Sequence, residues 1–149
     1  MYPDTTNGLP DPDLQAGFYA GVTSKRLIAW IIDLVLTAMI TALIVLFTAF
    51  VGLFFLPVLF LTVGFVYRVV SLAGSSATPG MRLMGIEFRD RFGHRFDLAL
   101  AALHTLGYTL SISTLIVQMV SVILMLTSSR GQGLTDIVLG TAAINSPAA

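Results

Sequence analysis

The chain alternates between long apolar runs and short polar segments. No charged residue occurs from Leu34 to Tyr67, and none occurs from Leu98 to Ser129. A helix that spans a membrane needs about 20 apolar residues, at a rise of about 1.5 Å per residue. With the apolar residues before it added, the first run is too long for one helix, and Gly52 lies within it. It predicts two antiparallel helices, about 27–48 and 53–72, joined by a tight turn.

Residues 98–127 form a third hydrophobic region with two unlike halves. Its first half is rich in small and mildly polar side chains, whereas Ile112 to Leu126 is strongly apolar. Two interpretations are open. The region is an interfacial helix followed by a spanning helix, or it is two short helices that dip into the membrane and return. The closing segment 133–141 lies on opposite sides of the membrane in the two cases.

The remaining segments are polar. Residues 1–24 contain prolines, glycines and three aspartates but no basic residue, which predicts a disordered polar tail and argues against a cleavable signal peptide. Residues 73–97 form a polar loop, in which the alternation at 86–89 and a turn at 90–93 predict a short β-hairpin. Residues 146–149 form a second short tail.

Composition places the chain among membrane proteins. Of its 149 residues 56% are hydrophobic and 11% are charged, compared with about 25% charged in soluble domains. We therefore expect an all-α integral membrane protein, a small helical bundle with at least three hydrophobic helices and a cytoplasmic loop between the second and the third. The lipid bilayer is its expected partner. No basic patch stands clear of the membrane flanks, so nucleic acid is not expected as a partner.

Seven of the eight basic residues flank one end of the predicted hairpin. They are Lys25, Arg26, Arg68, Arg82, Arg89, Arg91 and Arg95. Basic residues gather on the cytoplasmic side of membrane proteins, so this pattern predicts a cytoplasmic N-terminus in a multi-pass protein. Arg89 and Arg91, together with Arg82, are predicted to contact anionic lipid headgroups.

Asp33 lies inside the first apolar helix, and this placement has a cost. A carboxylate at mid-membrane costs about 2.5–3.5 kcal/mol on insertion scales, and less near the interface. Arg26 lies seven positions earlier, nearly on the same helical face. Arg68 reaches a similar depth in an antiparallel hairpin. Either Arg68 pairs with Asp33, or it extends alone to the lipid headgroups.

Three blocks in fixed order resemble the signatures of the RDD family, small bacterial integral membrane proteins named for one arginine and two aspartates. The blocks are 25–33, 78–86 and 133–141, within a resemblance that covers about residues 16–145. The residues that it marks are Arg26, Asp33 and Asp136, and in the loop Gly80, Arg82 and Gly85. Thr135 stands where the family often has histidine, and Met81 where a basic residue is common. A role that needs an imidazole beside Asp136 therefore does not follow from the resemblance.

The resemblance implies a bacterial cell (inner) membrane protein with a putative transport function. One hypothesis is Na⁺/H⁺ exchange, in which Arg26, Asp33 and Asp136 form a polar site for a cation or a proton. Three spans are too few to enclose a pathway, so exchange would require a homo-oligomer. The alternative is a non-catalytic accessory or assembly subunit of a larger membrane complex, in which these residues form a structural ion pair.

The remaining chemistry is sparse. No nucleophile lies in a pattern with a base, so we expect neither an enzyme nor a cofactor. His94 and His104 lack acids at ligand spacing, which predicts no metal site. His104 is predicted to be a satisfied interfacial side chain rather than a proton relay.

Overall fold

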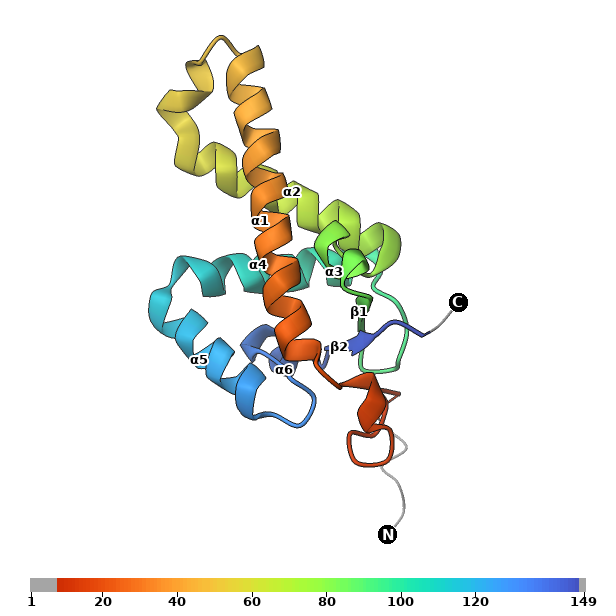
Figure 1. Cartoon of the computed structure of the whole chain (residues 1–149). Helices are drawn as coiled ribbons and strands as arrows, with labels where there is room; N and C mark the ends of the chain where they lie inside the picture. Colours follow the sequence, from red (N-terminus) through yellow and green to blue (C-terminus); the bar gives the residue numbers. More distant parts are fainter. Residues whose placement is uncertain (1–7, 148–149) are drawn as a thin grey trace.

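The computed structural model describes residues 8–147, and the chain is mostly helical (Figure 1). Two helical segments, Ala16–Phe47 and Val51–Ser75, are long and apolar enough to cross a membrane. The predicted class, a helical membrane bundle, is confirmed. The elements are η1 (Ala16–Phe18), α1 (Val22–Phe47), η2 (Val51–Phe55), α2 (Leu56–Ser75), α3 (Pro79–Leu83), β1 (Ile86–Arg89), α4 (Leu98–Ser113), α5 (Leu115–Thr127), α6 (Leu134–Leu139) and β2 (Ala142–Asn145).

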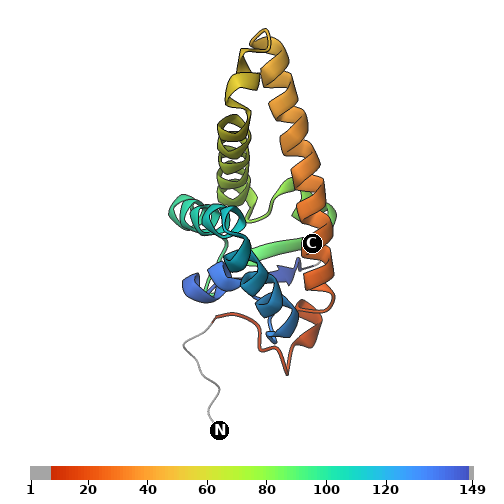
Figure 2. The ribbon, with the colours of Figure 1, turned by 90° about the vertical axis from the view of Figure 1, so that its left-hand side faces the viewer.

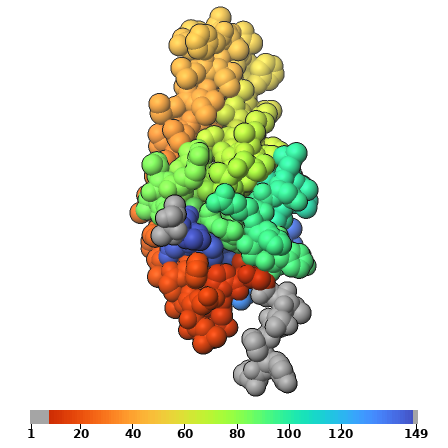
Figure 3. All heavy atoms as spheres, turned by 90° about the vertical axis from the view of Figure 1, so that its right-hand side faces the viewer, coloured from red at the N-terminus to blue at the C-terminus, as the bar shows by residue number. Residues whose placement is uncertain are grey.

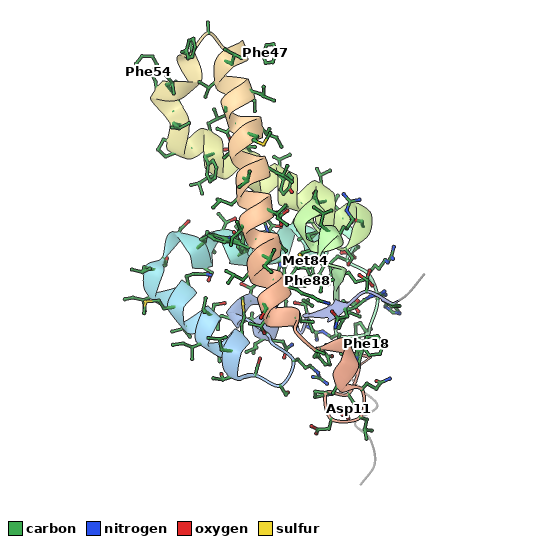
Figure 4. All side chains as sticks on the ribbon, viewed as in Figure 1. Asp11, Phe18, Phe47, Phe54, Met84 and Phe88 are labelled. Carbon is green, nitrogen blue, oxygen red and sulfur yellow. The ribbon has the colours of Figure 1, made fainter. Side chains whose placement is uncertain are left out.

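Helices α1 and α2 form the predicted hairpin, which projects as a narrow column from a broader body (Figures 2 and 3). Its tip is apolar, and Figure 4 shows Phe47 and Phe54 there, each more than four-fifths exposed. Both helices reach further into the body than expected, since α1 begins at Val22 and α2 ends at Ser75. Val22 and Leu72 are almost completely buried there, so packing against the body extends the helices beyond their most apolar parts.

The third hydrophobic region is two helices rather than one. Helices α4 and α5 meet at Thr114, whose backbone is extended, and their axes differ by 115°. At the other end of α4, the Asp97 side chain accepts a hydrogen bond from the Leu100 N–H and caps the helix. A bend of more than a right angle turns the chain back, as in the interpretation of two short helices that return.

A two-stranded antiparallel sheet joins distant parts of the chain. Strand β1 pairs with β2, with Ile86 opposite Asn145 and Arg89 opposite Ala142. The strand at 86–89 was predicted correctly, but the predicted hairpin partner within the loop was wrong. Phe96, on the far side of the turn, donates its N–H to Ser76 Oγ instead. Strand β2 takes the place of the predicted hairpin partner, because this apolar segment buries its side chains against the body.

The prediction of a disordered tail is wrong for residues 8–24. Leu9 is 7% exposed, Gly8 donates its N–H to the Arg91 carbonyl, and Tyr19 donates its hydroxyl to the Pro10 carbonyl. Asn145 of β2 donates to the carbonyl of Gly17. Composition argued against a packed core, but a backbone hydrogen bond to the loop and a side-chain hydrogen bond from the closing strand hold this segment. Residues 1–7 of the predicted tail, and 148–149 of the second, lie outside the described residues.

A small apolar core lies at the base of the hairpin, where α1, α2, α3, α4 and the two strands meet. It includes Val22, Ala29, Leu72, Met81, Ile86, Phe88, Phe96, Ala101 and Ala143. Figure 4 shows Phe88 within this region, beside the lower half of α1. Met81 is 4% exposed, so the position where the family often has a basic residue is an apolar core position in this chain.

Candidate functional site

Asp136 lies at the centre of a buried polar cluster in the body. It belongs to the first turn of α6 and is 1% exposed. Its Oδ2 accepts hydrogen bonds from Arg26 Nη1 at 2.7 Å and from the Gly133 N–H at 3.0 Å. Its Oδ1 accepts from His104 Nε2 at 2.7 Å and from Thr141 Oγ1 at 3.0 Å. Each carboxylate oxygen therefore has two donors.

Arg26 approaches Asp136 from the first turns of α1. Its Nη1 also donates to the Gly131 carbonyl at 3.0 Å, and its side chain is 14% exposed. The guanidinium carbon lies 5.3 Å from the centre of the Phe88 ring, within the range of a cation–π contact. Strand β1 thus presents the aromatic side of the cluster, while α6 supplies the anion.

His104 completes the cluster from α4. It is 2% exposed, and its ring centre lies 4.5 Å from that of Phe88. The Asp136 carboxylate can only accept a hydrogen bond, so His104 Nε2 carries the proton of a neutral imidazole. Nδ1 has no partner among residues 8–147, which fits a deprotonated ring nitrogen.

The pKa of Asp136 is held well below its usual range. Burial by itself would raise this pKa, because a carboxylate loses its water. The positive charge of Arg26 and the hydrogen bond from His104 outweigh burial and favour the ionised carboxylate. The cluster is thus an ion pair supported by a neutral imidazole.

Asp33 forms a separate polar centre higher on α1. Its Oδ1 accepts from Tyr67 Oη at 2.7 Å and from the Gly80 N–H at 2.9 Å, and its Oδ2 accepts from Thr78 Oγ1. Thr78 is in turn the N-cap of α3 and accepts the Met81 N–H. Asp33 therefore ties α2 and the start of α3 to α1.

The predicted constellation of Arg26, Asp33 and Asp136 is thus two clusters. Arg26 and Asp136 meet, whereas no ion pair joins Asp33 to an arginine among residues 8–147. Seven positions return to one helical face but advance by about 10 Å along the axis, which separates Arg26 from Asp33. Contact between Arg26 and Asp136 also requires that α4 and α5 bring the chain back to the start of α1.

Arg68 follows neither of its two predicted arrangements. It does not pair with Asp33, and it does not extend alone to the surface. Its guanidinium carbon lies 3.9 Å from the centre of the Tyr108 ring, and its Nε is buried without a partner within the described chain. Arg68 and Asp33 both line a cavity of about 280 Å³ between α1, α2 and the end of α4.

The predicted loop residues have different surroundings. Gly80 packs so closely on α1 that a Cβ there would lie 2.3 Å from the Ala29 carbonyl oxygen, and Gly85 ends α3 with a positive φ of 67°. Arg82 and Arg91 are exposed. Arg89 pairs with Glu87, and headgroup contact by Arg82, Arg89 and Arg91 stays a prediction. Both residues of the Arg89–Glu87 pair belong to β1, and Glu87 is 5% exposed.

Sequence reasoning missed His104 as a member of the cluster. It is the one histidine in the uncharged run from Leu98 to Ser129, which was the available signal. Thr135 lacks the imidazole that the family often has there, yet an imidazole does lie beside Asp136, supplied by α4. Phe88 gave no signal, because a strand of four residues does not show which face is buried.

Fold and site together define a helical membrane protein whose first and last signature blocks meet in a buried Arg–His–Asp cluster. A model described as the RDD family matches residues 19–140. The chain therefore belongs to the RDD family, as the three sequence blocks indicated. No significant match to it is found among the curated proteins or the solved structures.

Proposed function

We propose that the chain is a non-catalytic accessory or assembly subunit of a larger membrane complex. In this proposal the Arg26–His104–Asp136 cluster is a structural clamp, and the projecting hairpin is the part that meets other membrane proteins. One observation carries the proposal: both oxygens of Asp136 are fully occupied by donors, one of which is a guanidinium. Such a carboxylate stays ionised near neutral pH and has no free lone pair for Na⁺.

The hairpin supports the second half of the proposal. The upper part of α1 projects beyond the body beside η2 and the start of α2 (Figures 1 and 2), and exposed aromatic side chains such as Phe47 and Phe54 lie at the tip (Figure 4). Lipid chains or apolar helices of another membrane protein suit this surface equally well. In an assembly role, part of this apolar surface contacts another membrane protein and the rest contacts lipid.

Na⁺/H⁺ exchange by an oligomer is the second candidate, and one observation favours it. Asp33 lines a cavity, and its Oδ2 accepts one hydrogen bond where Oδ1 accepts two. To bind Na⁺ in this cavity, the protein must offer at least one oxygen lone pair that is not already used by a hydrogen bond. However, the Arg68 guanidinium lines the same cavity, and its charge disfavours Na⁺ there.

The proposal includes an orientation. Lys25, Arg26 and the arginines of the loop lie around the body, and the hairpin tip carries no charge. By the positive-inside rule the body faces the cytoplasm, with the N-terminus on that side of a bacterial inner membrane.

The experiment is Na⁺-dependent collapse of a pH gradient in everted vesicles that contain the native chain or Asp33→Asn. The assembly proposal predicts no Na⁺-dependent signal from native protein that is folded. It also predicts that native protein, extracted gently from its own membrane, migrates at a larger mass than the purified chain. A Na⁺-dependent signal that Asp33→Asn abolishes, while folding is kept, overturns the proposal in favour of exchange.

A further inference from the structure

Within residues 8–147, Arg68 forms no ion pair. No hydrogen bond from its guanidinium to any of residues 8–147 is present, and no carboxylate lies within ion-pair distance of it. Its one close partner is the face of the Tyr108 ring. By contrast, Arg26 and Arg89 are each paired with an acid. A half-buried guanidinium that lacks an anion is costly, and a bound anion would offset that cost.

The space beside Arg68 is built from three helices. The cavity of about 280 Å³ has Trp30 and Asp33 on its α1 side, Gly64 and Arg68 on α2, and Tyr108 on α4. Gly64 contributes no side chain, which leaves the wall open between the helices. Trp30 Nε1 donates to Tyr108 Oη at 2.7 Å, so α1 and α4 are held together across the cavity.

One carboxylate and one guanidinium line the cavity, and they differ in how fully their hydrogen bonds are satisfied. Asp33 already accepts three hydrogen bonds, from Tyr67, Thr78 and the Gly80 N–H. The donors of Arg68 are unused. The unmet requirement of the cavity is therefore for an acceptor with negative charge, and a planar guanidinium matches the oxygens of a phosphate particularly well.

The position of the cavity selects an amphiphile. Tryptophan and tyrosine side chains line it at the base of the apolar hairpin, and such rings favour the membrane interface. Its other lining residues include Leu34, Leu61 and Ile112, which continue into the apolar surfaces of the helices. The volume is at the lower end of small-molecule pockets, roughly 300–1,000 Å³. It suits a headgroup, with the acyl chains outside along α2.

We propose that the cavity between α1, α2 and α4 binds the phosphate of an anionic phospholipid headgroup on Arg68. This site lies outside the Arg26–His104–Asp136 clamp, and it does not depend on the assembly role. It gives the protein a preference for anionic lipid on the side of the membrane where the body lies.

Trp30 provides a direct reporter, because it is the sole tryptophan of the chain and it lines the cavity. The full chain, in a zwitterionic detergent, is titrated with phosphatidylglycerol, phosphatidylcholine or inorganic phosphate while Trp30 fluorescence is recorded. We expect a saturable change with phosphatidylglycerol, and at least tenfold weaker responses to the other two. Arg68→Gln is expected to weaken the phosphatidylglycerol response at least tenfold, whereas Arg95→Gln, at an exposed arginine outside the cavity, keeps it.

Each other outcome overturns the proposal. Equal responses to the two lipids mean that Arg68 does not select an anion. An equal response to inorganic phosphate assigns the site to a free anion rather than to a lipid. An unchanged response in folded Arg68→Gln removes this residue from the site. If Arg68→Gln does not fold, the native chain still tests the proposal through its responses to phosphatidylglycerol and phosphatidylcholine.

Discussion

Arg26 Nη1 lies 2.7 Å from Asp136 Oδ2, although 110 positions separate the two residues in the chain. The contact joins the first turns of α1 to the first turn of α6. Both residues are largely buried, so neither charge has water as a substitute partner. The ion pair therefore determines where the chain must return after the hairpin and the bent pair α4–α5.

Arg26→Ala is expected to destabilise the fold by about 3–5 kcal/mol, because it leaves the Asp136 carboxylate buried without its cation. The midpoint of unfolding in detergent micelles, by heat or denaturant, measures the loss. Arg82→Ala is the control, since Arg82 is exposed and a surface change of this kind shifts stability by about 0.5 kcal/mol or less. Replacement of both charges, Arg26→Met with Asp136→Leu, should cost less than Arg26→Ala alone. A loss for Arg26→Ala no larger than that of the control would show that the pair is not a clamp.

Acid should unfold the protein through Asp136. The folded chain holds the pKa of this carboxyl below its usual value, so the unfolded chain takes up the proton more readily. Its contribution to stability is complete above the ordinary aspartate pKa of about 3.9 and is lost as pH falls through the lower pKa of the folded state. Melting temperatures between pH 7 and pH 3 should fall more steeply for native protein than for Asp136→Asn. Parallel profiles for the two proteins would contradict this assignment.

Two glycine substitutions should act in opposite directions. A Cβ at Gly80 would lie 2.3 Å from the Ala29 carbonyl oxygen and 2.8 Å from Asp33 Oδ1, so Gly80→Ala should cost roughly 1–3 kcal/mol. Gly74 lies exposed in α2, and no atom lies within 4 Å of the position that an added Cβ would take, so Gly74→Ala should stabilise by up to about 1 kcal/mol. Both are measured by unfolding in the same detergent. Equal effects would mean that α3 does not pack closely on α1.

The return of the chain after α5 can be tested by labelling. The protein has no cysteine, so Ser129→Cys and Ala49→Cys each supply a single thiol, both at exposed positions. With an impermeant thiol reagent, Ala49→Cys should react in intact cells and Ser129→Cys in everted vesicles, because the two residues lie at opposite ends of the molecule. Reaction of both from the same side would show that α4 and α5 together cross the membrane once.

Apolar run length predicted the hairpin, because a run of that length has few ways to satisfy its backbone in lipid. The same reasoning left the third region open, since composition does not reveal a bend at Thr114. The pairing of β1 was predicted wrongly for a related reason. Local alternation identifies a strand but not its partner, and the partner at 142–145 is distant in sequence.

A charge inside an apolar helix identified Asp33, because such a residue requires a partner. The spacing from Asp33 drew attention to Arg26, and the resemblance to the RDD family added Asp136. Which partner each residue contacts depends on its position along the axis of α1. Arg26 and Asp33 share a face of α1 but lie at different heights along its axis. Arg26 therefore contacts α6, whereas Asp33 contacts α3. Backbone N–H groups and hydroxyls serve Asp33, and no sequence pattern shows them. His104 entered the cluster through the return of α4, which only the tertiary structure shows.

The sheet between β1 and β2 has a consequence for the order of folding. Strand β1 is synthesised long before its partner, and Arg26 long before Asp136. Contacts between segments so far apart in sequence form slowly and late. The hairpin can enter the membrane early, but the body cannot close, and Arg26 lacks its carboxylate partner, until residues 134–145 have been made. During this interval β1 has an unpaired edge, which is a ready template for pairing with another chain.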